Sequence, residues 1–280
     1  MILIDGKKIQ MEILAQVRKE LALLPYKPYF TDILIGSDPV NAKYVAMKKK
    51  TAEQIGFGYR DVIFDDSTTT EEIVNVIKKL NEDNDMAGII VQLPLPAQFD
   101  KQVILDAVSP AKDVDVLGGV ASDLFYKSES ALILPTANAV MKILKSINVD
   151  LKDKRILVLG QGPLVGKPVS HILNSEGIKH DVVTKNTDEN TKSDLIKSAD
   201  VLISAMGNPH AINSDMVKEG VVIIDAGTSE MEGSIVGDVD FASVESKVSY
   251  ITPTPGGVGP VTVACLFENV LQVAKQNIHE

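Results

Sequence analysis

The chain has little cysteine and no long apolar run, and each shortage excludes a class of protein. A single cysteine, Cys265, cannot form an internal disulfide framework, which fits the reducing cytoplasm. The longest apolar runs, such as residues 221–224, have the length of a strand and are too short to span a bilayer. Residues 1–6 lack the basic region and apolar core of a signal peptide. We therefore expect a protein of the cytoplasm, with no membrane partner.

Basic residues and metal-ligand patterns are scarce as well. The 28 Lys and Arg residues against 38 Asp and Glu residues give a net charge of −10, which argues against a nucleic-acid partner. Backbone dipoles can still bind an anionic ligand locally. Metal-ligand spacing is absent among the four histidines, His171, His180, His210 and His279. We predict no metal site.

Strand-like apolar segments alternate with amphipathic segments through most of the 280 residues. The strand-like segments are residues 29–35, 59–63, 88–92, 155–159, 181–184, 201–205 and 221–225. Such alternation predicts an α/β fold built from parallel βαβ units. The alternation breaks around residues 117–150, so we expect two α/β domains joined near that point.

Residues 252–262 carry Pro or Gly at six of eleven positions. Proline removes a backbone donor and glycine raises backbone entropy, so the segment predicts a stiff, irregular loop and no regular helix. It stands between a strand-like segment at 248–251 and a helix pattern at 263–274. Such a loop suits close backbone approach to a ligand, and an interdomain linker is the alternative.

A lysine interrupts the apolar side of one expected helix. Asp38 and Pro39 form a helix start, and Gly56 is a plausible end. Helical spacing places Lys48 in the middle of an apolar side formed by Tyr44, Val45, Ala52 and Ile55. The lysine is either a partly buried amine with a lowered pKa, able to exchange protons, or a stem on apolar surface with its ammonium in water.

Four segments together resemble one enzyme family. They are Tyr44–Lys48 (YVAMK), Gly88–Pro96 (GIIVQLPLP), Lys112–Asp115 (KDVD) and Pro255–Pro260 (PGGVGP). The chain is similar, from end to end, to the bifunctional methylenetetrahydrofolate dehydrogenase/methenyltetrahydrofolate cyclohydrolase family. The resemblance implies oxidation of 5,10-methylenetetrahydrofolate by hydride transfer to NADP, followed by hydrolysis of the methenyl cation to 10-formyltetrahydrofolate.

The resemblance also implies roles for particular residues. Lys48 would accept the proton of the attacking water, Gln92 would set the state of Lys48, and Asp115 would grip the pterin. Tyr44 would stack on or orient the folate and completes the catalytic set. Folate-binding residues implied in this way are Tyr44, Gln92, Leu93, Pro94, Asp115, Pro255, Gly256, Gly257 and Val258.

The nucleotide half begins where the strand at 155–159 enters a glycine turn at 160–166. The spacing Gly-x-Gly-x-x-x-Gly is a weak motif alone, although such a turn suits a pyrophosphate. No acidic residue follows the strand at 181–184, and Lys185 does, so NADP is favoured over NAD, which stays possible. Implied cofactor-binding residues are Gly160, Gln161, Gly162, Val165, Lys185, Thr187, Thr228, Gly259 and Thr262.

The resemblance implies a domain plan. Residues 1–134 with 263–280 would form a catalytic folate-binding domain, and residues 135–262 a Rossmann-like NAD(P)-binding domain, with the active-site cleft between them. It further implies a homodimer and a place in one-carbon metabolism and purine biosynthesis.

Several positions depart from the family pattern. Gly160-Gln161-Gly162 stands where many members read Gly-Arg-Ser, and Val116 follows Asp115 where Gly is common. Thr228 stands where an isoleucine normally touches the cofactor. Most departures are on the cofactor side, so two alternatives remain. One is a cofactor-impaired cyclohydrolase or folate-binding relative, and the other is a two-domain NAD(P)-dependent dehydrogenase of shikimate type.

Overall fold

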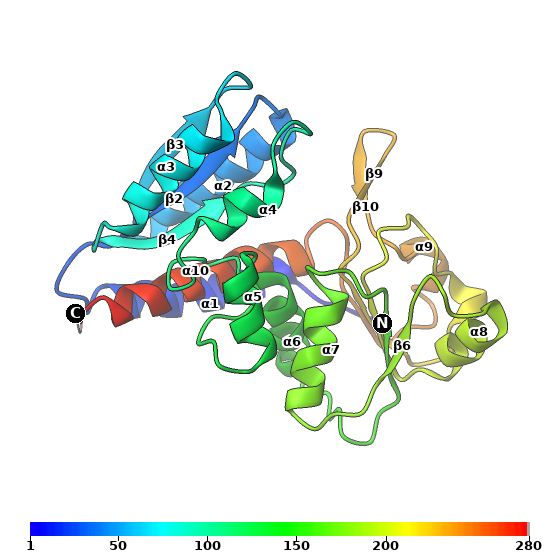
Figure 1. Ribbon diagram of the computed structural model, residues 1–280. Helices are drawn as coiled ribbons and strands as arrows, with labels where there is room; N and C mark the ends of the chain where they lie inside the picture. The colour runs from blue at the N-terminus through cyan, green and yellow to red at the C-terminus, as the bar shows by residue number, and fades with distance from the viewer. Residues whose placement is uncertain (279–280) are drawn as a thin grey trace. The chain divides into compact units, whose positions relative to one another are not determined.

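The computed structural model describes residues 1–278 and divides them into two compact units (Figure 1). The six-stranded unit comprises residues 1–11 and 135–265, and the three-stranded unit comprises residues 12–134 and those from 266 onward. His279 lies outside the described residues.

The three-stranded unit is built on a parallel sheet in the order β3-β2-β4. Its core packs isoleucines of the sheet against α3, as Ile33 and Ile89 do with Ile73 and Ile77. The strand β2 is central: β3 pairs with one of its edges and β4 with the other. The strand order therefore reverses between β2 and β4, at their carboxyl ends. The elements are β2 (Tyr29–Ile35), α2 (Pro39–Ile55), β3 (Gly58–Phe64), α3 (Thr70–Asn81), β4 (Met86–Val91), α4 (Lys101–Asp106) and α5 (Gly119–Tyr126).

The six-stranded unit has a parallel sheet in the order β1-β11-β8-β7-β5-β6. Apolar side chains from its central strands form the core, among them Leu157, Leu202 and Ile223. The strand order reverses between β5 and β7. The elements are β1 (Ile2–Leu3), α6 (Pro135–Ser146), β5 (Ile156–Leu159), α7 (Gly166–Ser175), β6 (Asp181–Val183), α8 (Glu189–Ser198), β7 (Val201–Ser204), η1 (Ser214–Met216), β8 (Val222–Asp225), β9 (Ser229–Met231), β10 (Ser234–Val236), α9 (Phe241–Val244) and β11 (Tyr250–Ile251). Two further helices, α1 (Gly6–Leu21) and α10 (Val258–Gln276), contribute residues to both units.

The α/β class and the Rossmann-like parallel sheet are confirmed, and each expected strand is present within two residues of its predicted ends. The start of the chain differs from the predicted domain plan. Residues 1–11 group with the six-stranded unit because β1 pairs in parallel with β11, an edge pairing too short to be visible as a pattern.

The prediction of an irregular loop over residues 252–262 is wrong for its second half. The helix α10 begins at Val258, so Pro260 lies in its first turn. Proline is tolerated there because the first backbone N–H groups of a helix have no intrahelical partner. The irregular part is residues 252–257, where Gly256 has a φ of +108° and the N–H of Gly257 donates to Pro253 O at 2.8 Å.

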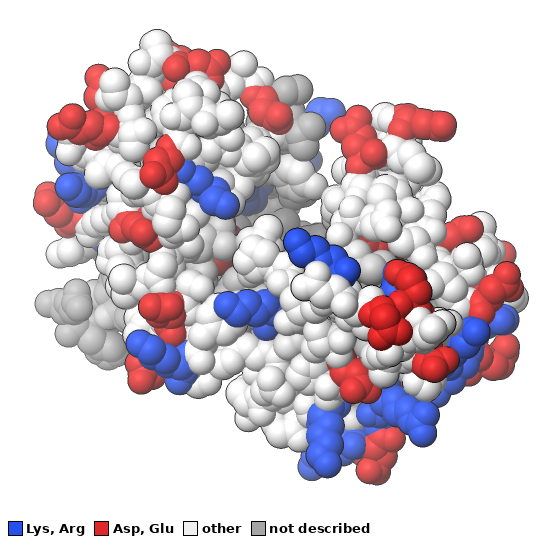
Figure 2. All heavy atoms as spheres, turned by 45° about the vertical axis from the view of Figure 1, so that its right-hand side comes forward, with Lys and Arg blue, Asp and Glu red and all other residues white. Residues whose placement is uncertain are grey.

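On the face drawn in Figure 2, acidic and basic side chains are interspersed. No helix within residues 1–278 is long and apolar enough to cross a membrane.

Candidate active site

Lys48 is buried on the inner side of α2, which is the first of the two alternatives that the helical spacing left open. Its exposure is 7%, and Val45, Ala52 and Ile55 are buried with it. The helix begins as predicted, because Asp38 Oδ1 accepts the N–H of Asn41 at 2.9 Å. Burial among these apolar side chains leaves the ammonium dependent on polar partners inside the protein.

Two side chains supply those partners. Lys48 Nζ donates to Gln92 Oε1 at 3.0 Å and forms an ion pair with Asp32 Oδ1 on β2. Asp32 is 1% exposed, and its other oxygen accepts the Tyr59 hydroxyl at 3.3 Å. Burial raises the pKa of Asp32, although the charge of Lys48 acts against this. The amine is therefore held between an amide and a carboxylate.

Gln92 lies directly after β4, and its orientation is set by Asn41. Gln92 Nε2 donates to Asn41 Oδ1 at 3.4 Å and to Leu93 O at 3.1 Å, so its Oε1 faces Lys48. Asn41 is 2% exposed and donates from Nδ2 to Pro94 O at 3.1 Å. One buried asparagine thus holds both the amide and the loop that follows it.

Asp115 lies near this group, in the loop before α5. Its side chain is half-buried, and burial raises its pKa to about 7, while the charge of Lys48 lowers it and Asp113 raises it. Asp113 holds the loop, because its Oδ2 accepts the N–H groups of Leu117 at 2.9 Å and Gly118 at 2.7 Å. A carboxyl group with such a pKa changes charge near neutrality.

Val116 occupies a backbone conformation that favours glycine. Its φ is +59° and its side chain is 1% exposed. A β-branched residue is strained in the left-handed region, which explains why glycine suits this position. Here the buried valine side chain offsets part of that strain.

The remaining folate-side residues of this unit are open to solvent. Tyr44 is 40% exposed, although the helical spacing assigned it to the apolar side. Leu93 is half-buried and Pro94 is exposed. Tyr44, Leu93 and Pro94 therefore leave accessible surface near Lys48 and Gln92.

In the six-stranded unit, the glycine turn follows β5 where the strand order reverses. Gly160 has a φ of +90°, and a Cβ there would lie 2.4 Å from Ala205 O, in the loop after β7. A Cβ on Gly166 would lie 2.0 Å from Gly160 O. Two glycines are therefore required for the chain to pass from β5 into α7. A Cβ on Gly162 would meet nothing within 4 Å.

Two buried carboxylates hold the neighbouring loops. Asp238 accepts the Ser204 hydroxyl at 2.7 Å and the N–H groups of Met206 at 2.7 Å and Asn208 at 2.8 Å. Asp225, at the end of β8, accepts the N–H groups of Gly227, Asp238 and Val239. Burial raises the pKa of Asp225 to about 6, while these N–H groups lower it. The loops after β7 and β8 are thereby fixed by their backbone donors.

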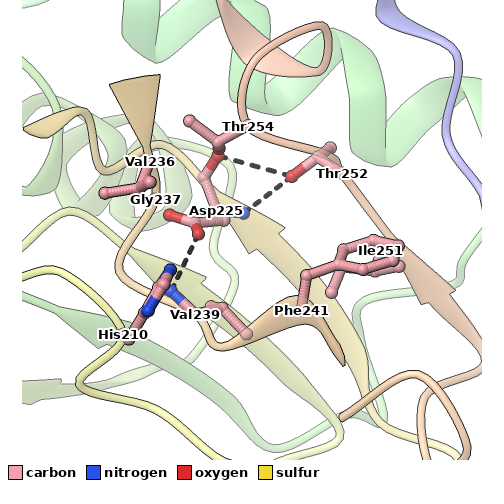
Figure 3. Close-up of a pocket in the computed structure, with 9 residues that line it drawn as sticks. All are labelled: His210, Asp225, Val236, Gly237, Val239, Phe241, Ile251, Thr252 and Thr254. Atoms are coloured by element: carbon pink, nitrogen blue, oxygen red, sulfur yellow. Dashed lines mark hydrogen bonds between the residues drawn. The ribbon is translucent and has the colours of Figure 1, made fainter. Parts of the chain in front are cut away.

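Figure 3 shows a small cavity beside Asp225, about 60 Å³ in volume. It has room for only a few water molecules and is well below the ~300 Å³ of a small-molecule pocket. His210, Thr252 and Thr254 are among its lining residues, and none of the predicted cofactor-binding residues is. A cavity of this volume is too small for a nucleotide.

The other predicted cofactor residues lie at several places in this unit. Gln161 Nε2 donates to Ser170 Oγ at 3.0 Å, which ties the turn to α7, and Val165 directly precedes that helix. Thr187 Oγ1 accepts the N–H of Thr184 at 3.0 Å, and Lys185 between them is exposed. The last three follow β8 or lie in the first turns of α10: Thr228 and Gly259 are exposed, and Thr262 Oγ1 donates to Val258 O at 3.1 Å.

The predicted folate residues 255–258 also belong to this unit. Pro255 is exposed, Gly256 is half-buried and Val258 is 6% exposed. Gly257 packs so tightly that a Cβ on it would lie 2.6 Å from Pro253 O, and one on Gly6 would lie 1.9 Å from Gly257 O. Close backbone packing thus explains why this position is a glycine.

Three polar residues around Lys48 were missed in the sequence: Asp32, Asn41 and Tyr59. Asp32 carried a usable signal, since it is the only charged residue in the otherwise buried strand Tyr29–Ile35. Asn41 and Tyr59 gave none, because a polar residue in a first helical turn or an aromatic residue in a strand is ordinary. Among residues 1–278, no group of three or more His, Cys, Asp and Glu could hold a metal ion.

Comparisons with known proteins cover the whole chain. The family model of the tetrahydrofolate dehydrogenase/cyclohydrolase catalytic domain matches residues 4–115, and that of the NAD(P)-binding domain matches residues 135–278. Bifunctional protein FolD of Hydrogenobaculum sp. is 39% identical over 280 residues, which are 99% of each chain.

Solved structures of the same family have the same fold as this chain. The FolD methylenetetrahydrofolate dehydrogenase/cyclohydrolase of Campylobacter jejuni matches with a TM-score of 0.93 and 36% identity over 99% of each chain. The Trypanosoma brucei enzyme, complexed with NADP cofactor and inhibitor, matches with a TM-score of 0.92 and 33% identity, over 100% of this chain and 99% of that one.

Proposed function

Because the chain belongs to the tetrahydrofolate dehydrogenase/cyclohydrolase family, we propose that it performs both reactions of that family. It oxidises 5,10-methylenetetrahydrofolate to the 5,10-methenyl cation with NADP and then hydrolyses the cation to 10-formyltetrahydrofolate. The observation that carries the proposal is the buried Lys48 amine, held by Gln92 and Asp32 where the strand order reverses. A shikimate-type dehydrogenase is not favoured, because both family models and the relatives extend over nearly the whole chain.

Hydrolysis needs a proton acceptor beside the cationic carbon. Water forms a carbon–oxygen bond to that carbon, and its proton passes to Lys48 Nζ. Gln92 Oε1 directs the amine, and Asn41 keeps the Gln92 amide in that orientation. Tyr44, Leu93 and Pro94 supply the exposed surface on which the folate would lie.

Asp115 is proposed to bind the pterin. Adjacent N–H donors of the pterin suit a carboxylate, which accepts two parallel hydrogen bonds. The pKa of Asp115 is about 7, so the carboxyl group is mostly protonated below pH 7. Binding of the pterin favours the ionised carboxylate, so below pH 7 it releases a proton. The roles of Pro255, Gly256, Gly257 and Val258 as folate contacts, and of a cleft between the two domains, stay predictions.

NADP fits the turn after β5. Gly160 and Gly166 bring the chain into α7 with no side chain in the way, which leaves backbone N–H groups and a helix N-terminus for a pyrophosphate. Bound NADP would accept the hydride of the dehydrogenase reaction. Lys185 is exposed after β6, where it could meet the 2′-phosphate, and Gln161, Gly162, Val165, Thr187, Thr228, Gly259 and Thr262 complete the proposed set.

We also propose that the enzyme is a homodimer of the cytoplasm that supplies one-carbon units for purine biosynthesis. The single, buried Cys265 is consistent with a reducing compartment. Sedimentation equilibrium tests the dimer, since a monomeric mass at micromolar concentration would contradict it.

The test of the function follows both reactions in one assay. Reduced nicotinamide and the methenyl intermediate are recorded at two wavelengths after methylenetetrahydrofolate is mixed with NADP or NAD. Lys48→Met should abolish hydrolysis and leave the fold intact, whereas Lys50→Met, an exposed lysine on the same helix, should leave hydrolysis unchanged.

Two results would contradict the proposal. Hydrolysis by Lys48→Met at the wild-type rate would remove Lys48 from the mechanism. Calorimetric titration that detects no binding of NADP or NAD would instead favour a folate-binding relative that has lost the cofactor.

A further inference from the structure

Asp32 is a buried carboxylate that the hydrolysis described above does not use. It lies in the middle of β2, and its register partner on β3 is Asp61. One Asp32 oxygen pairs with Lys48 Nζ, and the other accepts the Tyr59 hydroxyl at 3.3 Å. Burying a carboxylate costs stability unless an oppositely charged, hydrogen-bonded partner offsets that cost.

The neighbouring lysine offers an internal comparison. Lys49 Nζ pairs with Asp61 Oδ2 at 2.6 Å, with side-chain exposures of 43% and 42%, whereas the Lys48 and Asp32 side chains are 8% and 0% exposed. The two pairs thus join consecutive lysines of α2 to register partners of one sheet. Only the buried pair also contacts Gln92.

The charged and titratable groups that face the buried pair come from three directions. On α2 there is Lys49, on β3 there are Tyr59 and Asp61, and in the loop before α5 there is Asp115, itself affected by Asp113. Burial raises the pKa of Asp32 most strongly, Asp61 adds to this, and Lys48 and the Tyr59 hydroxyl act in the opposite direction. Burial disfavours charged groups, so it brings the neutral pair closer in free energy to the ion pair.

We propose that Asp32 is a positioning residue for Lys48, which holds the amine against Gln92 and takes up its proton before water attacks. The proposal rests on the role of Lys48 in hydrolysis. A lysine can accept a proton only as a neutral amine, and a cationic substrate disfavours an ammonium group beside it.

The protons balance. The proton of Lys48 Nζ moves to an Asp32 oxygen, and the ion pair becomes a neutral pair. The water oxygen then bonds to the methenyl carbon, and a water proton passes to the electron pair of Nζ. As the bond between this carbon and N5 breaks, the pair returns its extra proton to N5. The hydroxyl proton of the adduct leaves to solvent, so the reaction releases one proton.

The first experiment compares Asp32→Asn with Asp61→Asn in the full-length enzyme. Asp32→Asn should lower kcat for methenyltetrahydrofolate hydrolysis about 10²-fold, with KM within twofold. It should also move the acid limb of the pH–rate profile to higher pH, because no neighbour takes the Lys48 proton. The NADP-dependent oxidation needs no proton acceptor and should change less than about fivefold. Asp61→Asn removes only a smaller contribution to the pKa of Asp32, so it should slow hydrolysis far less than Asp32→Asn does.

A second variant keeps the proposal testable if Asp32→Asn does not fold. Tyr59→Phe removes a hydrogen bond that favours the ionised Asp32 carboxylate. Its acid limb should also move to higher pH, by less than in Asp32→Asn. A folded Asp32→Asn with the wild-type kcat and pH profile, or an unmoved profile in Tyr59→Phe, would overturn the proposal.

Lys48→Met separates this failure from a failure of the proposed function. If Lys48→Met is inactive and Asp32→Asn is like the wild type, only the role of Asp32 is wrong. If Lys48→Met itself hydrolyses normally, the mechanism on which both proposals depend is wrong.

Discussion

The two units place their candidate sites by the same topological rule and build them from different materials. In each, the site lies at the carboxyl ends of two parallel strands where the strand order reverses, β2 and β4 in one unit and β5 and β7 in the other. In the three-stranded unit, the side chain of Lys48 contacts those of Asp32 and Gln92. In the six-stranded unit, glycines clear the space, and carboxylates are used to hold backbone N–H groups.

The difference agrees with the proposed role of each site. Moving a proton requires groups that titrate, and only side chains do so. Binding a pyrophosphate requires several donors on one concave surface, which the backbone supplies without titrating. Substitutions at the site of the three-stranded unit should therefore change the rate of hydrolysis. Substitutions in the glycine turn of the six-stranded unit should change backbone geometry and, with it, NADP binding.

The largest effect is expected for Gly166→Ala. The new Cβ would lie 2.0 Å from Gly160 O, a backbone atom that cannot move aside cheaply. We expect loss of measurable NADP binding by calorimetry and a fall in unfolding free energy of about 3 kcal/mol. Hydrolysis of added methenyltetrahydrofolate by the folded fraction should persist. A variant with wild-type NADP affinity would show that this turn is not the nucleotide site.

A large effect of the other kind is expected for Gln92→Ala. It removes the amide that accepts from Lys48 at 3.0 Å and leaves the sheet intact. Hydrolysis should slow about 10²-fold at unchanged NADP affinity and with a melting temperature near that of the wild type. Asn41→Ala should reproduce part of the rate loss, because Gln92 then loses one of its two amide acceptors. Equal rates in both variants and the wild type would contradict a side-chain site.

This contrast also explains how far the sequence could be read. Alternating apolar segments predicted both sheets. Helical spacing placed Lys48 on the apolar side of its helix, but it did not decide between a buried amine and an ammonium in water. Asp32 was missed, although it is the only charged residue of its strand, because periodicity does not mark a single carboxylate and its partner lies 16 residues away on another element. The helix start at Val258 was missed, because helix propensities count Pro and Gly as unfavourable everywhere. In a first turn, the backbone N–H groups have no intrahelical partner, so a proline there removes no hydrogen bond.

Asp115 should give a moderate, pH-dependent effect. Its pKa is about 7 in the folded protein, above the ordinary value of 3.8, because burial disfavours the charged form. A pterin bound to the carboxylate must displace that proton, so folate affinity should fall up to about tenfold per pH unit below 7. Asp115→Asn should bind more weakly near neutrality, with little pH dependence, as measured by fluorescence titration. A wild-type affinity that is flat with pH would contradict the assignment.

The same shift has a consequence for stability, with the opposite sign from a salt-bridged carboxylate. Between about pH 4 and about pH 7 the folded protein keeps the Asp115 proton that the unfolded chain has lost, so this group makes stability fall as pH rises. In Asp115→Asn that part of the slope should vanish. Urea unfolding at several pH values measures it, and an unchanged slope would assign it to other groups.

The smallest effect is expected at Gly162, and it sharpens the contrast within the glycine turn itself. A Cβ there meets nothing within 4 Å, and the resemblance noted above includes members with serine at this position. Gly162→Ala should leave NADP affinity within about twofold and raise the unfolding free energy by about 0.5 kcal/mol, because alanine reduces the entropy of the unfolded chain. If it instead weakens NADP binding tenfold without loss of stability, the ligand itself needs that space. The turn would then be shaped by its ligand at Gly162 and by its own backbone at Gly160 and Gly166.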